Sequence, residues 1–165
     1  MIKVAIGQDS HGFEPEGGSK KLILAGIGIE DCPGLAGNSD ADVVLHAITN
    51  AVSGITCVNI LGKISDDMCL NKGITNSRAY LAEALKYMEA SRILHVSVSI
   101  EALRPKLAAY IERMRDSIAD LLGISACSVG ITATTGEGLT EFGKGNGIFC
   151  TVILTAQAPD SREML

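Results

Sequence analysis

Apolar and polar side chains alternate over one segment in the middle of the chain: Leu94-His95-Val96-Ser97-Val98-Ser99-Ile100. A period of two is typical of a β-strand with one buried face, because successive side chains point to opposite sides of a strand. Beyond Pro105 the apolar residues recur at helical spacing as far as Gly123, a residue that commonly ends helices. The pattern predicts a strand and then a helix that follows Pro105, since proline is favoured in a first helical turn.

The same two periodicities assign the segments on either side. Toward the N-terminus they predict a strand over residues 2–7, a small hairpin or bent strand over 22–29, and a helix over 40–52 that starts near Asp40. A polar loop over residues 62–76 and a second helix over 77–89 follow. Toward the C-terminus they predict two closing strands, residues 129–135 and 147–156. Ser39 and Asp42 resemble a capping box for the first helix, and Asn76 is the expected cap of the second.

This order mixes strands and helices without regular alternation, which favours an α/β fold of the α+β type. We expect a single domain over residues 1–165, with a mixed or antiparallel four-stranded main sheet, helices on one face and a small hairpin. The other face of the sheet needs a cover, and a partner subunit packed through the sheet side would supply one. The tail beyond residue 157 is expected to be flexible.

The composition excludes several classes of protein. Apolar residues make up 47% of the chain and charged residues 20%, as in globular proteins, and no apolar run is long enough to cross a membrane. A net charge of -5 argues against a nucleic-acid partner. The five cysteines form no C-x-x-C pair and residues 1–7 resemble no signal peptide, so we expect free thiols in the cytoplasm.

Three residues could hold a metal ion. Asp9 and His11 are two positions apart in an extended segment, so their side chains point the same way. His46 lies on the first predicted helix, four residues after Asp42. One carboxylate and two imidazoles suit zinc and leave a fourth position open. The alternative to a metal site is that Asp9 caps a turn and His46 is an ordinary core histidine, which the same spacing allows. His95 lies on the polar side of its strand and is expected to be structural.

Three further segments could contact phosphate. The hydroxyl and N–H groups of residues 132–135 could cradle one, and Glu137 could hold a hard cation. Lys144 stands in a glycine-rich stretch, residues 143–147, that has neither P-loop nor Rossmann spacing. Pro105-Lys106 precedes a helix, whose free N–H groups attract anions. Each of these segments alone could equally be an ordinary turn or helix start.

Taken in order, these pieces resemble the 2-C-methyl-D-erythritol 2,4-cyclodiphosphate synthase family of the methylerythritol phosphate pathway. The matching motifs span residues 1–157: Asp9-Ser10-His11, Asn38-Ser39-Asp40-Ala41-Asp42 with His46, Pro105-Lys106, Ala133-Thr134-Thr135-Gly136-Glu137 and the glycine loop of residues 143–147. The resemblance implies a phosphorus-oxygen lyase of isoprenoid precursor synthesis. Its substrate would be 4-diphosphocytidyl-2-C-methyl-D-erythritol 2-phosphate, which cyclises with release of CMP.

The resemblance also implies how the site is assembled. The family forms a homotrimer with active sites between subunits, in which Asp9, His11 and His46 would bind one transition metal, most simply zinc, per subunit. Glu137 would hold Mg²⁺ or Mn²⁺ with the diphosphate. Asn38 and Thr135 would be the catalytic residues. The substrate-binding residues would be Asn38, Ser39, Gly62, Asp66, Asp67, Ala102, Pro105, Lys106, Leu107, Thr134, Thr135, Glu137 and Lys144.

The chain departs from the family pattern at several positions. Asn38 replaces the usual histidine of the helix motif, Ile60 replaces an aspartate that contacts ribose, and Lys144 replaces a common arginine. Two alternatives to an active synthase stay open, the first of them because of Asn38 and Ile60. One is a catalytically silent homologue that binds nucleotide or isoprenoid diphosphate, and the other is a zinc hydrolase of a different fold with Asp40 or Asp42 as its base.

Overall fold

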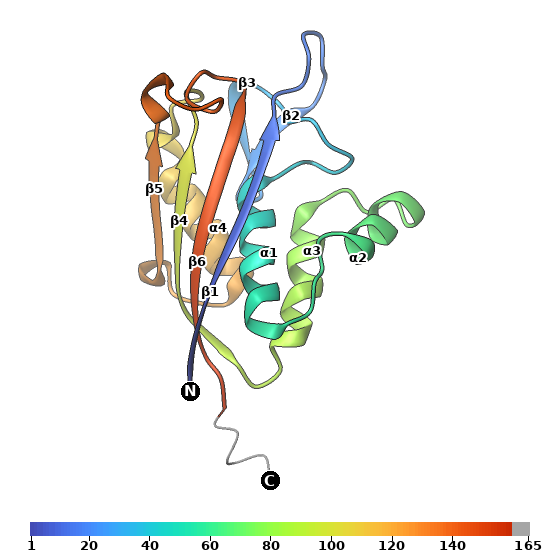
Figure 1. Ribbon diagram of the computed structural model, residues 1–165, viewed down its shortest axis with the longest axis vertical. Coiled ribbons are helices and arrows are strands. Elements are labelled where there is room, and N and C mark those ends of the chain that lie inside the picture. The colour runs from blue at the N-terminus through green and yellow to red at the C-terminus, as the bar shows by residue number, and fades with distance from the viewer. Residues whose placement is uncertain (160–165) are drawn as a thin grey trace.

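A four-stranded mixed sheet runs through the molecule, with its strands in the order β1-β6-β4-β5 (Figure 1). These strands are β1 (Ile2–Gly12), β4 (Arg92–Glu101), β5 (Val129–Thr134) and β6 (Gly147–Gln157). Strands β4 and β5 are parallel, whereas β6 is antiparallel to both β1 and β4. The computed structural model describes residues 1–159, apart from the side chain of Asp31. It confirms the predicted mixed sheet; residues 160–165 of the expected tail lie outside the described part.

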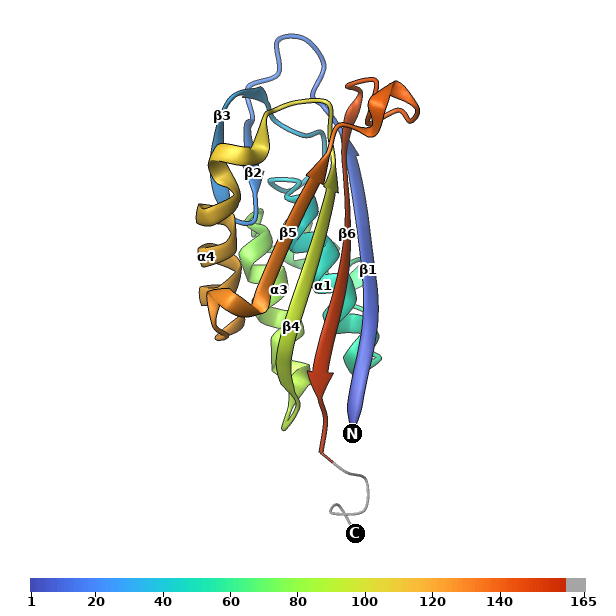
Figure 2. The same cartoon turned by 90° about the vertical axis from the view of Figure 1, so that its left-hand side faces the viewer.

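Helices cover one face of this sheet and leave the other bare, as predicted (Figure 2). The main helices are α1 (Val43–Thr56), α3 (Ser77–Leu85) and α4 (Ile111–Leu122). Their apolar stripes pack on the alternating inward residues of the strands, such as Val98 and Ile100 of β4, to form one core. Apolar side chains also stand on the bare face, where Val4 and Ile6 of β1 are 65% and 61% exposed.

The predicted hairpin is present as β2 (Lys21–Leu24) and β3 (Ile27–Pro33), which pair antiparallel beside the main sheet. Its two-residue turn, Ala25-Gly26, has positive φ at both positions, the backbone that tight hairpins require. No helix within residues 1–159 has the length and apolar character needed to cross a membrane.

Two strands differ in detail from their predicted form. Strand β1 extends to Gly12, so Asp9 and His11 lie within it rather than after it. In β4 the pairing with β6 shifts between Ile93 and His95. This irregularity turns Ile93 into the core and leaves Leu94 half-buried, so the strict alternation holds only from Val96 onward.

The start of the first helix was predicted wrongly. Helix α1 begins at Val43 and not near Asp40, because Asp42 is its N-cap and accepts hydrogen bonds from the N–H groups of Val44 (3.1 Å) and Leu45 (3.0 Å). Ser39 instead accepts from the N–H of Ala41, so the expected capping box does not form. Asn76 does cap α3, as predicted.

The predicted loop of residues 62–76 is largely helical. It contains α2 (Lys63–Asp66) and a π-helical turn, η1 (Asp67–Asn71). Ser65 secures the start of α2, because its hydroxyl accepts from the N–H of Gly62 at 3.0 Å and donates to the Gly62 carbonyl at 3.1 Å. The polar composition that suggested a loop reflects the solvent-exposed side of these turns.

The helix after Pro105 also starts later than predicted. A 3₁₀ turn, η3 (Leu107–Tyr110), comes first, and α4 begins at Ile111. Gly123 ends α4 in the left-handed conformation, as expected. The remaining short turns are η2 (Lys86–Met88), which follows α3 where the predicted helix continued, η4 (Ala126–Ser128) and η5 (Gly136–Gly138).

Candidate metal centre and adjoining pockets

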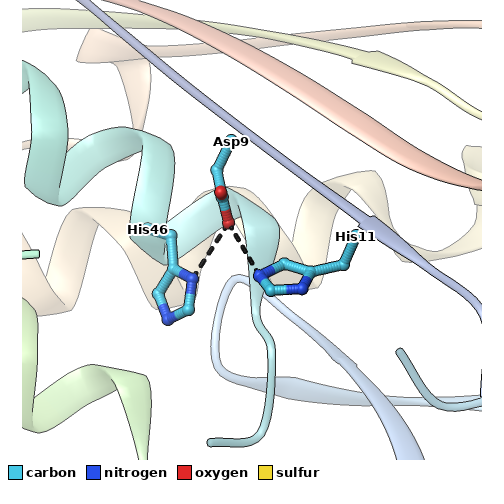
Figure 3. A group of neighbouring side chains, drawn as sticks. All are labelled: Asp9, His11 and His46. Atoms are coloured by element: carbon cyan, nitrogen blue, oxygen red, sulfur yellow. Dashed lines mark hydrogen bonds and ion pairs between the residues drawn. The ribbon is translucent and has the colours of Figure 1, made fainter. Parts of the chain in front are cut away.

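The three predicted metal ligands converge on one point between β1 and α1 (Figure 3). Oδ2 of Asp9 lies 2.9 Å from Nδ1 of His46 and 3.2 Å from Nε2 of His11. One donor atom from each of the three side chains lies within 4.8 Å of the others. The ordinary alternatives, a capping aspartate and an isolated core histidine, do not describe this arrangement.

Local structure explains why these three residues meet. The alternation of β1 places Asp9 and His11 on the same side of the strand, as predicted. That side is the one that the helices cover. Helix α1 can lie close to β1 because Gly7 has no side chain; a Cβ there would be 2.0 Å from the carbonyl oxygen of Ala47. His46 then faces Asp9 from the helix. Asp42, one turn earlier, is buried as the helix cap and is not one of the three converging side chains.

The contacts stabilise the charged forms of Asp9 and His11. Burial raises the pKa of Asp9, but hydrogen bonds and charge from His11 and His46 outweigh burial and hold that pKa at about 2. The hydrogen bond to Asp9 raises the pKa of His11, against an opposing effect of burial. The aspartate is therefore anionic at neutral pH, which is the state that a metal ligand needs.

The donor set fits a divalent transition metal such as zinc. It consists of one carboxylate and two imidazoles, and three protein ligands leave a fourth position free. The ring of His11 is held by its other nitrogen, since Nδ1 lies 2.7 Å from the carbonyl oxygen of Ala36, which can only accept. Nδ1 therefore carries the hydrogen, and the lone pair of Nε2 faces the centre.

Asp9 and His46 open into a first pocket of about 220 Å³. Several residues predicted to bind substrate line it, namely Asn38, Ser39 and Asp66. Gly62 and Asp67 are not among the lining residues. Gly62 is the N-cap of α2, and the Asp67 carboxylate pairs with Nζ of Lys72 at 2.7 Å. Sequence reasoning missed Cys69 and Tyr80, which also line this pocket, because neither belongs to a recognisable motif.

A second pocket, of about 240 Å³, shares no lining residue with the first. It brings together the segments around Pro105 and Thr134 that were predicted to contact phosphate or nucleotide. The predicted residues that line it are Ala102, Pro105, Lys106, Leu107, Thr134 and Thr135.

Glu137 and Lys144 also lie outside both pockets. Glu137 is in the turn η5 with a positive φ of 53°. Nζ of Lys144 pairs with the carboxylate of Glu141 at 2.7 Å, on the loop between η5 and β6. The structure of this one chain therefore does not bring Glu137 or Lys144 to the metal centre.

Comparison with known proteins identifies the family. The model of the YgbB family matches residues 2–157. The chain belongs to the YgbB family. A relative in this family, the 2-C-methyl-D-erythritol 2,4-cyclodiphosphate synthase of Chlamydia felis, is 49% identical over 156 residues, which cover 94% of this chain and 89% of the relative.

Solved structures agree with this membership of the YgbB family. The bifunctional IspDF of Campylobacter jejuni superposes with a TM-score of 0.86 and 26% identity, over 97% of this chain and 43% of that longer chain. A 2C-methyl-D-erythritol-2,4-cyclodiphosphate synthase described as bound to CDP superposes with a TM-score of 0.83 and 25% identity, over 94% of this chain and all of the other. These comparisons confirm the family that the sequence motifs resembled.

Proposed function

We propose that this protein cyclises 4-diphosphocytidyl-2-C-methyl-D-erythritol 2-phosphate to 2-C-methyl-D-erythritol 2,4-cyclodiphosphate and releases CMP. The observation that carries the proposal is the convergence of Asp9, His11 and His46 beside a polar pocket, in a chain 49% identical to a named synthase. In the reaction an oxygen of the 2-phosphate bonds to the β-phosphorus. The bond from that phosphorus to the oxygen bridging to the α-phosphorus breaks, and CMP leaves with the electron pair.

The first pocket would bind the methylerythritol phosphate half of the substrate. Asp9, His11 and His46 would hold one zinc-type ion there, and such an ion supplies Lewis-acid stabilisation of phosphate charge. Asn38 and Ser39 line the same pocket and can donate hydrogen bonds to phosphate oxygens. Because the reaction is intramolecular, the main task of these side chains is to orient the 2-phosphate toward the diphosphate.

The second pocket would bind the cytidine half. Lys106 offers a cation to the diphosphate, and the hydroxyls of Thr134 and Thr135 offer hydrogen bonds. Thr135 would stabilise the charge that develops at the phosphorus. Glu137, on the turn that follows, would hold the Mg²⁺ or Mn²⁺ that accompanies the diphosphate, with Lys144 nearby in sequence as a further cation.

We propose a homotrimer in which the first pocket of one subunit faces the second pocket of its neighbour. Each pocket has a volume below the roughly 300–1,000 Å³ of sites that enclose a whole ligand. The bare sheet face, with Ile2, Val4, Ile6 and Ile153 exposed, offers an apolar surface for subunit contact. The five cysteines are all free in the described part of the chain, which supports a cytoplasmic location.

A catalytically silent homologue is the second candidate, favoured by Asn38 and Ile60 in place of the usual histidine and aspartate. Asn38 cannot carry the positive charge of a histidine, and Ile60 is fully buried and contacts no solvent. The presence of all three predicted metal ligands favours the active enzyme.

One experiment separates these candidates. The purified protein is incubated with the cytidyl diphosphate substrate, Zn²⁺ and Mg²⁺, and the phosphorus species are followed by NMR. We expect CMP and a cyclic diphosphate from the wild type and from Thr49→Val, a variant on the same helix as His46 whose lost hydroxyl donates only to the carbonyl of Leu45. His46→Ala should form neither product. Intact substrate with the wild-type protein, at concentrations where binding is measurable, would support the silent homologue.

A further inference from the structure

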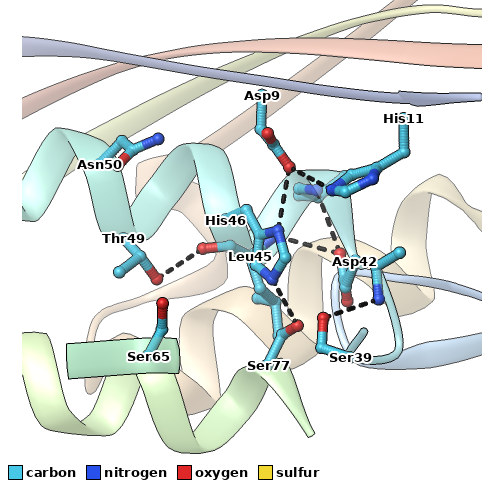
Figure 4. Close-up of polar contacts among 12 residues, drawn as sticks. Asp9, His11, Ser39, Asp42, Leu45, His46, Thr49, Asn50, Ser65 and Ser77 are labelled. Atoms are coloured by element: carbon cyan, nitrogen blue, oxygen red, sulfur yellow. Dashed lines mark hydrogen bonds and ion pairs between the residues drawn. The ribbon is translucent and has the colours of Figure 1, made fainter. Parts of the chain in front are cut away.

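The nitrogen of His46 that points away from the metal centre has a side-chain partner. Nδ1 of His46 faces Asp9, and Nε2 lies 2.8 Å from the hydroxyl oxygen of Ser77 (Figure 4). Ser77 is the first residue of α3 and is fully buried. Its hydroxyl is also in short hydrogen-bond contact with Oδ1 of Asp40, while its backbone N–H donates to Oδ2 of Asp40 at 3.1 Å. Asp40 thus holds Ser77 at two points.

Counting hydrogens gives each contact a direction. An ionised carboxylate can only accept, so the single hydrogen of the Ser77 hydroxyl goes to Asp40. The hydroxyl oxygen must then accept from Nε2–H of His46. With a metal ion at the centre, a neutral His46 ring that carries its hydrogen on Nε2 would present the lone pair of Nδ1 to that ion, in place of the contact that Nδ1 makes with Asp9 at 2.9 Å.

We propose that Ser77 and Asp40 are positioning residues that hold His46 in the orientation and tautomer required to bind a metal ion. The inference rests on the metal centre of the proposed function. Partners of this kind typically change metal affinity by about 10- to 100-fold. They matter more for His46 than for His11, because the ring of His11 is oriented by a backbone carbonyl, that of Ala36, which no side-chain substitution removes.

The contacts of Asp40 require an aspartate, because an asparagine at this position would reverse the hydrogen bonds to Ser77 and His46. Oδ2 faces the N–H of Ser77 and must be an acceptor, so in Asp40→Asn the amide oxygen takes that place. The NH₂ group then faces the Ser77 hydroxyl, which is left to donate its hydrogen to Nε2 of His46. The hydrogen of the ring would move to Nδ1, where it blocks the ligand position without any loss of side-chain volume.

Zinc affinity, measured by competition with a chromophoric chelator and without substrate, tests the inference. The variants are Ser77→Ala and Asp40→Asn, and the matched control is Thr49→Val. Thr49 is equally buried, on the same helix as His46, but its hydroxyl donates to the carbonyl of Leu45 at 2.7 Å and does not contact the ring. A second readout is the ring N–H signal of His46 in the proton NMR spectrum of the zinc-loaded protein.

We expect Ser77→Ala and Asp40→Asn to lower the zinc affinity about 10- to 100-fold and to abolish the protected Nε2–H signal, while Thr49→Val keeps both. Zinc affinities of the two variants equal to that of Thr49→Val would overturn the inference, as would a wild-type protein that binds no zinc. A wild type that binds zinc but does not turn over substrate would refute the proposed reaction and leave this inference intact.

Discussion

Two imidazole rings share one carboxylate oxygen at the centre of the site, and this arrangement has a consequence for metal uptake. Oδ2 of Asp9 lies within 3.2 Å of His11 Nε2 and 2.9 Å of His46 Nδ1. The hydrogen bond to Asp9 raises the pKa of His11 above its usual 6.5. Below that raised pKa the ring carries a second proton, on the Nε2 lone pair that a metal would use, so metal and proton compete for the same atom.

We therefore predict that zinc binding weakens as the pH falls through the raised pKa of His11. Below that pKa the ring is protonated, and each displaced proton costs about tenfold in affinity per pH unit. Asp9 stays ionised throughout, because its pKa is about 2. The check is chelator competition at about pH 6 and about pH 8, with calorimetry in two buffers to count the released protons. Equal affinities at both values and no proton release would contradict the prediction.

At the scale of the element, the contact between β1 and α1 sets the distance from Asp9 to His46. A Cβ on Gly7 would lie 2.0 Å from the Ala47 carbonyl oxygen and 2.4 Å from the Ala51 nitrogen, both backbone atoms that cannot move separately from the helix. The metal centre therefore depends on the absence of a side chain at Gly7, which lies two residues before Asp9, the first metal ligand in the sequence.

We predict that Gly7→Ala destabilises the protein by about 1–3 kcal/mol or more, the range that overpacking usually costs, and weakens zinc binding because α1 is pushed away from β1. Gly130→Ala on β5 is the control, since its Cβ would meet only the carbonyl oxygen of Val96, at 4.0 Å. Urea unfolding gives the stabilities of both variants. A Gly7→Ala protein as stable as Gly130→Ala would show that the two elements are not in such close contact.

Elements with a clear apolar period could be predicted from the sequence, and those held by side-chain hydrogen bonds could not. The strands around Val98 and Ile153 and the helix that carries His46 follow from their patterns. The turns α2 and η1 do not, because their polar residues resemble a loop and no apolar period marks the segment that the hydrogen bonds of Ser65 to Gly62 begin. Asp42 was expected in the first turn of α1 and instead precedes it as the cap.

The candidate site shows the same division. The two-residue repeat of an extended strand was enough to place Asp9 and His11 on the same side of β1. The ordered set of motifs indicated His46 as the third metal ligand. The neighbours of His46 were not foreseen, since Ser77 and Asp40 are separated by 37 positions and meet only after α3 packs on α1. Glu137 and Lys144 lie outside both pockets of the single chain, and their proposed roles depend on how subunits meet.

For the whole molecule, the proposed trimer predicts that two inactive variants can restore each other. His46→Ala damages the first pocket and Thr135→Ala the second. If each active site joins the first pocket of one subunit to the second pocket of its neighbour, an equal mixture refolded together contains about one quarter intact sites. We expect about a quarter of the wild-type rate from the mixture and none from either variant alone. An inactive mixture that still forms mixed trimers would show that each subunit contains a complete site.

The position of β6 in the sheet also determines how the chain must fold. Strand β6 lies between β1 and β4, with Ile2 opposite Gln157 and Glu101 opposite Phe149, although the ribosome makes it after both neighbours. Until it emerges, β1 and β4 present unpaired edges, and such edges are prone to join other chains. Contacts this distant in sequence also form slowly. A nascent chain stalled before residue 147 would thus be unable to close its sheet and would depend on chaperones to stay soluble.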